Sequence, residues 1–135
     1  MKIEIDHIGI ALHSINNALS FYQQLLEVEK SGEEILEERG IKIAFLYVND
    51  VRIELMEPIR EDSEISNFLQ KRGEGFHHIA YKVDDIEKVF EKSKELGYRT
   101  LSDKPTIGAE GNLVFFLHPK SANGILTEFV QSINE

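Results

Sequence analysis

Two histidines and two glutamates recur at matched places in the chain, and their side chains can bind metal ions and transfer protons. His7 lies in IDHIGIALHSI, and His78 follows 71 positions later in GEGFHHIAYKVDDI. Glu54 lies in VRIELME, and Glu128 follows 74 positions later in GILTEFV. Alternate residues of a strand share one face. We therefore expect all four side chains to project from sheet faces next to small or apolar neighbours.

Imidazole nitrogens and carboxylate oxygens in one set are typical of a divalent cation site. A carboxylate on an enclosed sheet face is costly unless a charged partner compensates it. Any one of these residues, taken alone, is explained as an ordinary buried polar group. Because a His and a Glu recur in both halves, we instead predict one metal site formed by His7, Glu54, His78 and Glu128. A mixed nitrogen and oxygen set with room for waters indicates Co, Ni, Mn, Fe or Zn, and not a closed structural zinc site.

The elements that must position these residues follow from periodicity. Residues 2–12 alternate as a strand, and Ser14 is a good N-cap for an amphipathic helix that follows. A polar segment at 31–40 predicts a loop or edge strand. Two strand-like runs then follow, IKIAFLYV and VRIELMEP, with a tight turn at Asn49-Asp50.

A short helix at 63–72, ended by Gly73, links this half to a second half with the same order. The second half reads as a strand at 76–83, a helix capped by Asp84-Asp85, a strand followed by a turn in YRTLSDKP, and two more strands, NLVFFL and GILTEFV. The spacing of 71 also relates Ile8 to Ile79 and Ile15 to Ile86. Such a repeat indicates an internal duplication.

We therefore predict an α+β fold in which two βαβββ modules form one curved, cup-like mixed sheet around a metal site. A chain of 135 residues is long enough for one core and too short for two independent ones. The prediction is a single domain over 1–135, with modules at about 1–60 and 74–132 joined by the helix at 63–72.

Composition excludes several classes of function. The net charge of -9 disfavours nucleic-acid binding, and the lack of cysteine excludes disulfides, thiolate metal sites and a Cys nucleophile. No apolar run is long enough to span a membrane, and the first residues do not resemble a signal peptide. We expect a cytoplasmic protein.

The remaining candidates for chemistry are interpreted as structural or solvated. His77 alternates with His78 and so faces the other way, and His13 and His118 lie at junctions between elements. Four cations are interpreted as solvated surface charges: Arg52, Lys71, Arg72 and Lys120.

Paired βαβββ modules with a His/Glu set resemble the vicinal oxygen chelate, or glyoxalase, superfamily. Within it, the segments DHIGIA, ELMEP, SNFLQKRGEGFHHIAYKVDDI and FLHPKSANGILTEFVQ resemble methylmalonyl-CoA epimerases. The resemblance covers nearly the whole chain and implies that His7, His78 and Glu128 bind the metal. The fourth ligand of that family is often Gln, and this chain has Glu54 there.

The resemblance implies an isomerase that removes and returns the α-proton of methylmalonyl-CoA through a metal-stabilised enolate. Some of these epimerases carry a second carboxylate base where this chain has Ile43. We therefore predict Glu128 as one base and Glu54 as the second proton relay. The substrate is expected to be a small acyl-CoA, and the protein is expected to form a homodimer without nucleic-acid or membrane partners.

Two alternatives follow from the same residues. A His-Glu-His-Glu set is also found in bacterial lactoylglutathione lyases, whose reaction likewise needs proton removal and return. A non-catalytic, ligand-binding member of the superfamily is the other alternative. A complete metal set argues against it, because a sequestering protein has no need of these residues.

Overall fold

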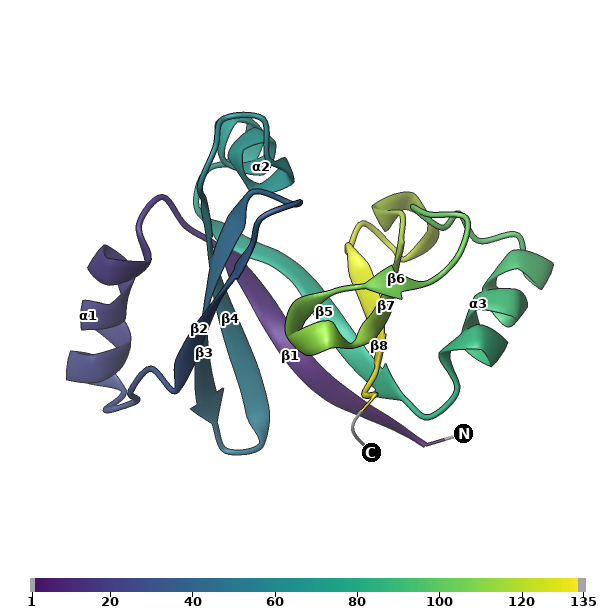
Figure 1. Ribbon diagram of the computed structural model, residues 1–135, viewed down its shortest axis with the longest axis horizontal. Helices are drawn as coiled ribbons and strands as arrows, with labels where there is room; N and C mark the ends of the chain where they lie inside the picture. The colour runs from purple at the N-terminus through teal and green to yellow at the C-terminus, as the bar shows by residue number, and fades with distance from the viewer. Residues whose placement is uncertain (1, 134–135) are drawn as a thin grey trace. The chain divides into compact units, whose positions relative to one another are not determined.

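The computed structural model describes residues 2–133 and contains the βαβββ order twice (Figure 1). The first set is β1 (Ile3–Ala11), α1 (Ile15–Leu25), β2 (Gly32–Leu36), β3 (Ile41–Val48) and β4 (Val51–Pro58). Helix α2 (Glu64–Arg72) follows. The second set is β5 (Gly75–Val83), α3 (Ile86–Glu95), β6 (Thr106–Ile107), β7 (Leu113–Leu117) and β8 (Thr127–Gln131), with 3-10 turns at Ala109–Gly111 and Pro119–Ser121. The predicted α+β class with two βαβββ modules is confirmed.

The chain divides into two compact units. Residues 7–77 form the first unit, and residues 2–6 together with 78–133 form the second. The linking helix α2 therefore belongs to the first unit, and β1 begins in the second unit and continues in the first. The modules predicted from the sequence, at about 1–60 and 74–132 with α2 between them, remain a prediction. That the whole chain is one cooperative domain remains a prediction.

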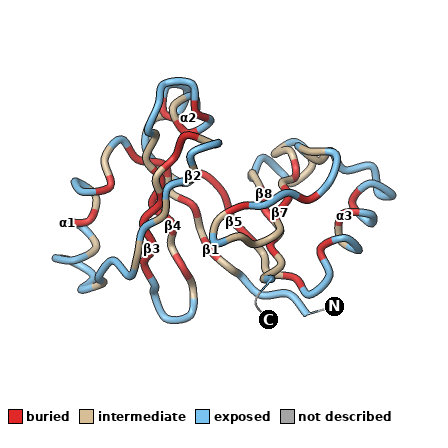
Figure 2. Tube along the Cα trace, in the orientation of Figure 1, coloured by how far each residue is buried: buried red, intermediate tan, exposed pale blue. Residues whose placement is uncertain are grey.

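In the first unit the strand order is β2-β3-β4-β1. Strands β1 and β4 are parallel, while the β2–β3 and β3–β4 pairs are antiparallel. The turn between β3 and β4 is tight, as predicted, with Val48 opposite Val51 and Asn49 at a positive φ of 55°. Helix α1 covers one face of this sheet. The core between them consists of Leu12, Ile15, Leu19, Ala44, Leu46 and Leu55 (Figure 2).

In the second unit the order is β5-β8-β7-β6, and β5 and β8 are again parallel. Helix α3 packs on one face, and Phe115 stacks on Phe129 with ring centroids 5.0 Å apart. The core under the helix consists of Val83, Ile86, Phe90, Phe115 and Leu117. A separate apolar cluster contains Ala80, Val114 and Val130. As predicted, each unit has an apolar face toward its helix, and the opposite face is available for the His/Glu residues.

Both long helices begin in the same way. Ser14 and Asp85 are the N-caps, and their side chains accept hydrogen bonds from the N–H groups of residues 17 and 88. The first residue of each helix donates its N–H to a side chain of the last strand of its module. Ile15 donates to Glu57 at 2.7 Å, and Ile86 donates to Gln131 at 2.8 Å. Each helix start is therefore tied to the strand that carries the glutamate of its unit.

Two sequence predictions for the second unit were wrong in detail. The run at 98–105 contains only an isolated bridge between Thr100 and Leu117, and the strand β6 lies later, at Thr106–Ile107. The segment 124–126 precedes β8 and is not part of it. Both segments adjoin turn-forming residues, and alternation of apolar and polar side chains does not distinguish a strand from an extended loop.

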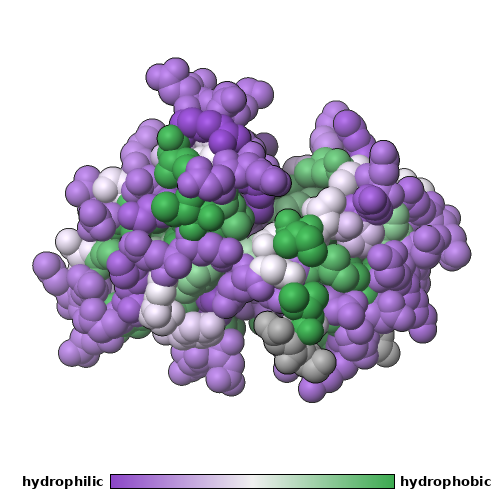
Figure 3. All heavy atoms as spheres, in the orientation of Figure 1, coloured by the Kyte–Doolittle hydropathy of each residue, from purple (hydrophilic) through white to green (hydrophobic). Residues whose placement is uncertain are grey.

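The face shown in Figure 3 is largely hydrophilic, which agrees with the excess of acidic residues. Within residues 2–133, none of the helices combines the length and apolar character needed to cross a bilayer.

The division of β1 between two units predicts that a chain cut after the linking helix does not fold. Residues 1–72 expressed alone should give an aggregating or unfolded chain, because the start of β1 would lose the unit to which it belongs. Circular dichroism during heating, compared with the full chain, measures this. A soluble monomeric fragment with a sharp unfolding transition would contradict the prediction.

Candidate functional site

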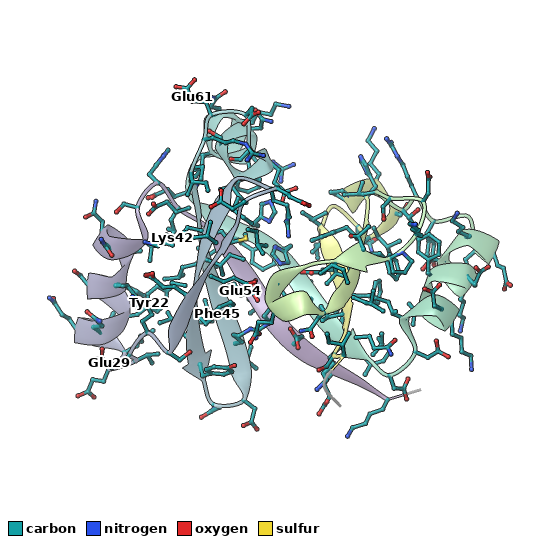
Figure 4. The ribbon with its side chains drawn as sticks, in the orientation of Figure 1. Tyr22, Glu29, Lys42, Phe45, Glu54 and Glu61 are labelled. Atoms are coloured by element: carbon teal, nitrogen blue, oxygen red, sulfur yellow. The ribbon has the colours of Figure 1, made fainter. Side chains whose placement is uncertain are left out.

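The first His–Glu pair lies within the first unit. His7 comes from β1 and Glu54 from β4, and each residue is 2% exposed. The parallel register places Gly9 beside Glu54, which leaves space next to the carboxylate. His7 Nε2 lies 3.5 Å from Glu54 Oε1. Figure 4 shows Glu54 on the side of the sheet away from α1, while Tyr22 lies on the helix side.

The other oxygen of Glu54 contacts a cation. Arg52 Nη2 lies 2.9 Å from Glu54 Oε2, and the Arg52 guanidinium carbon lies 5.0 Å from the centroid of the Phe45 ring. Arg52 is only 8% exposed. The prediction that Arg52 is a solvated surface charge was therefore wrong. The guanidinium is buried because a carboxylate compensates its charge and an aromatic ring covers its face.

The second pair lies within the second unit. His78 from β5 is 2% exposed and Glu128 from β8 is 5% exposed. His78 Nε2 lies 3.0 Å from Glu128 Oε1. The parallel register places Ala80 beside Glu128, as Gly9 lies beside Glu54. The ring of Phe116 meets the His78 imidazole edge to face, with centroids 5.7 Å apart, and this contact orients the imidazole.

A phenylalanine is also duplicated, which the sequence analysis missed. Phe45 is the cross-strand partner of Glu54, and Phe116 is the cross-strand partner of Glu128. Phe45 and Phe116 are 71 positions apart, the spacing that relates His7 to His78. Extending that spacing along the third strand of each half would have found the pair. Each buried carboxylate thus has a small residue on one side and an aromatic ring on the other.

Each pair has the spacing that two ligands of one ion require. Bonds of about 2.1 Å from an ion to nitrogen and oxygen place two ligand atoms about 3.0 Å apart at a right angle and about 3.4 Å apart at a tetrahedral angle. The observed separations of 3.5 Å and 3.0 Å fit these arrangements. Buried imidazole and carboxylate groups also match the chemistry of a divalent cation. Both half-sites therefore fit a metal.

The position where some relatives of the resembled family carry a second base is apolar in this chain. Ile43 is 1% exposed and is the cross-strand partner of Met56, which is also 1% exposed. Ile43 alternates with Ala44 of the helix-facing core and so lies on the face of Glu54. Ile43 and Met56 form an apolar surface in this part of the first unit, and neither side chain can accept or donate a proton.

Of the remaining histidines, His77 and His118 have structural surroundings and His13 is exposed to solvent, as predicted. His77 is 8% exposed and meets Phe68 of α2 edge to face at 4.8 Å. His118 Nδ1 accepts the N–H of Lys120 and so caps the turn that follows β7. The backbone N–H of His13 donates to Glu74 at 2.9 Å, and the residue is exposed.

The chain was compared with protein families and with individual known proteins, and both comparisons identify similar proteins. The Glyoxalase/Bleomycin resistance protein/Dioxygenase superfamily matches residues 6–116. The ethylmalonyl-CoA/methylmalonyl-CoA epimerase of Cereibacter sphaeroides is 38% identical over 129 residues, which cover 94% of this chain and 96% of that protein.

Two solved structures are similar over almost their full length. A hypothetical protein of Bacillus halodurans is 46% identical with a TM-score of 0.96, covering 100% of this chain and 98% of that one. A variant of the Streptomyces coelicolor methylmalonyl-CoA epimerase, in complex with 2-nitronate-propionyl-CoA, is 40% identical with a TM-score of 0.92. That match covers 96% of this chain and 94% of the other. With its duplicated modules and His/Glu pairs, the chain belongs to the glyoxalase/bleomycin resistance protein/dioxygenase superfamily.

Proposed function

We propose that this chain is a metal-dependent methylmalonyl-CoA epimerase. The observation that carries the proposal is the similarity, over nearly the full chain, to proteins named as epimerases of methylmalonyl-CoA. One relative is named for ethylmalonyl-CoA as well, and one solved structure holds methylmalonyl-CoA itself. The two buried His–Glu pairs are consistent with this activity, because epimerisation next to a thioester needs proton transfer and stabilisation of negative charge.

We assign one divalent ion to the set His7, Glu54, His78 and Glu128. The fit of each pair to a ligand spacing supports this assignment. Co, Ni, Mn, Fe and Zn all suit such ligands. When bound, the ion would act as a Lewis acid toward the charge that develops on the substrate as its α-proton leaves.

We assign Glu128 as the base that takes the α-proton. Its carboxylate is held by the His78 pair and lies beside Ala80, where a small side chain leaves room for a substrate. Glu128 would hold the ion together with His78, and its carboxylate would be the group that receives the proton. The ring of Phe116 packs edge to face against the His78 imidazole and limits its rotation.

The chemistry of the four residues also suits lactoylglutathione lyase, the second candidate. Here Glu54 completes the His-Glu-His-Glu set described above for bacterial enzymes of that activity. The same assay therefore has to test both substrates. As partners we propose only a small acyl-CoA and a second copy of the chain, and as location the cytoplasm.

The test of the function is incubation of the protein with one stereoisomer of methylmalonyl-CoA in deuterated water. An epimerase should convert part of the substrate into its epimer and introduce deuterium at the α-carbon. Mass spectrometry detects the deuterium. Glutathione with methylglyoxal is assayed in parallel by the formation of lactoylglutathione. Activity in the second assay alone would replace the epimerase with the lyase. Inactivity in both, with metal bound, would favour a non-catalytic binding protein.

The metal assignment predicts the effect of removing an imidazole. His7→Ala and His78→Ala should each lower the content of divalent metal, after dialysis, well beyond tenfold, because each variant loses a direct ligand. Elemental analysis of the purified proteins measures the metal. His118→Ala, which removes a histidine of a surface turn, serves as the control and should keep its metal. Full metal content in both ligand variants would exclude this site.

The assignment of Glu128 as the base predicts a large loss of turnover when Glu128 is replaced by Gln, a side chain of nearly the same shape. Glu128→Gln should lose on the order of 10²-fold or more in turnover at saturating metal, the usual scale for loss of a general base. Glu91→Gln removes an exposed carboxylate from α3 of the same unit and should be unaffected. Metal content is measured in parallel. Turnover of the metal-loaded Glu128→Gln protein near that of the parent would assign the base elsewhere.

A further inference from the structure

Arg52 is a buried cation beside a proposed metal ligand. It lies on β4 directly opposite His7 in the parallel register, two residues before Glu54. Its side chain is 10% exposed and that of Glu54 is 3% exposed. A guanidinium removed from water to this extent needs a charged partner and a surface to cover its planar face. The structure supplies both, and both lie close to the site.

The contacts of Arg52 divide the two oxygens of Glu54 between different partners. Arg52 Nη2 lies 2.9 Å from Oε2, while His7 Nε2 lies 3.5 Å from Oε1. The ring of Phe45, 5.0 Å from the guanidinium carbon, limits the movement of Arg52. Phe45 is in turn the cross-strand partner of Glu54, so the three side chains form one packed group on β3 and β4. The ion pair with Arg52 therefore restricts the orientation of the carboxylate.

We propose that Arg52 is a positioning residue that fixes Glu54 as a single-oxygen metal ligand, by holding Oε2 and presenting only Oε1. This inference rests on the proposed metal set. The inference adds Arg52, which was expected to be solvated, to the proposed metal site. Arg52 acts on the site by orienting Glu54 and does not contact the substrate. A contact of this kind, beyond the direct ligands, typically changes metal affinity by 10- to 100-fold.

The proposal revises the role expected of Glu54. A relay of the second proton requires Glu54 to release either the metal or Arg52, and the packed group opposes both movements. We therefore expect Glu54 to remain a ligand during turnover. The second proton then comes from another donor, such as an ordered water.

Metal-saturated Glu54→Gln should keep turnover within about tenfold of the parent, the reverse of the loss expected for a general base. A loss of 10²-fold or more at full metal occupancy would restore Glu54 as the relay and overturn this part of the proposal.

A double-mutant cycle tests the positioning role directly. The full-length parent, Arg52→Met, Glu54→Gln and the Arg52→Met/Glu54→Gln double variant are stripped of metal and titrated with Co²⁺ by calorimetry. Arg52→Met alone should weaken Co²⁺ binding by about 10- to 100-fold, because Glu54 loses its fixed orientation. Lys42→Met removes a cation from the neighbouring strand β3, where Lys42 pairs with Glu33, and should bind Co²⁺ like the parent.

The change in Co²⁺ affinity caused by Arg52→Met in the Glu54→Gln background decides whether Arg52 acts through Glu54. Glutamine has a single carbonyl oxygen, so Arg52 and the metal compete for it. Removing Arg52 in that background should leave Co²⁺ affinity unchanged or raise it. An equal loss in both backgrounds would show that Arg52 supports the fold in general, and would overturn the proposal. If the parent itself fails to bind Co²⁺, the metal assignment fails, and this is a separate result.

Arg52→Met leaves a buried carboxylate without its cation, so the folded state is checked by thermal unfolding without metal. If this variant does not fold, the cycle is carried out with Arg52→Lys, which keeps the charge but not the planar fork. Arg52→Lys should show a smaller loss of Co²⁺ affinity than Arg52→Met, and that loss should again disappear in the Glu54→Gln background. A loss that persists in the Glu54→Gln background would count against the positioning role.

Discussion

A buried carboxylate needs a compensating charge, and this requirement governs the arrangement of both units. Glu54 and Glu128 are almost fully buried, and the cost of removing a carboxylate from water is several kcal/mol unless charged or hydrogen-bonding groups replace the water. In each unit a histidine from the parallel neighbouring strand lies beside the carboxylate, and in the first unit Arg52 adds a positive charge. The parallel pairing of the first and last strands of a module is what brings a histidine and a glutamate distant in sequence to one place.

The helices follow from the same pairing. Parallel strands need a crossover connection, and α1 and α3 provide part of it. The N–H of the first residue of each helix is bound by a side chain of the last strand, Glu57 in one unit and Gln131 in the other. These residues lie three positions after Glu54 and Glu128. The helix start and the carboxylate are therefore positioned by the same short strand, and movement of that strand would affect both.

Much of this could be predicted from the sequence because it depends on local rules. Period-two alternation indicated the strands that carry the four site residues, and Ser14 and Gly73 occupy the predicted cap positions. The environment of Arg52 could not be predicted in this way. A charged residue at an alternating strand position is normally solvated, and its burial here depends on Phe45, which lies beside it only through the β3–β4 register. Strand β6 was missed because two residues are too few to show a period.

Duplication relates the proposed ligands of the two halves, whereas differences between the halves distinguish the surroundings of these residues. His7 and His78, Glu54 and Glu128, and Phe45 and Phe116 occupy matched positions.

The neighbours of these matched residues differ. Phe116 packs against the imidazole of its own unit, while Phe45 packs against the guanidinium of Arg52. The position matched to Arg52 in the second half is Leu126. Epimerisation takes a proton from one side of a stereogenic α-carbon and returns one to the other side, so a proton-transferring group is needed on each side. Two identical halves would present the same carboxylate twice. Because only the first half places an arginine two residues before its glutamate, the two carboxylates have different surroundings, and under the proposed function they would take different parts in the reaction.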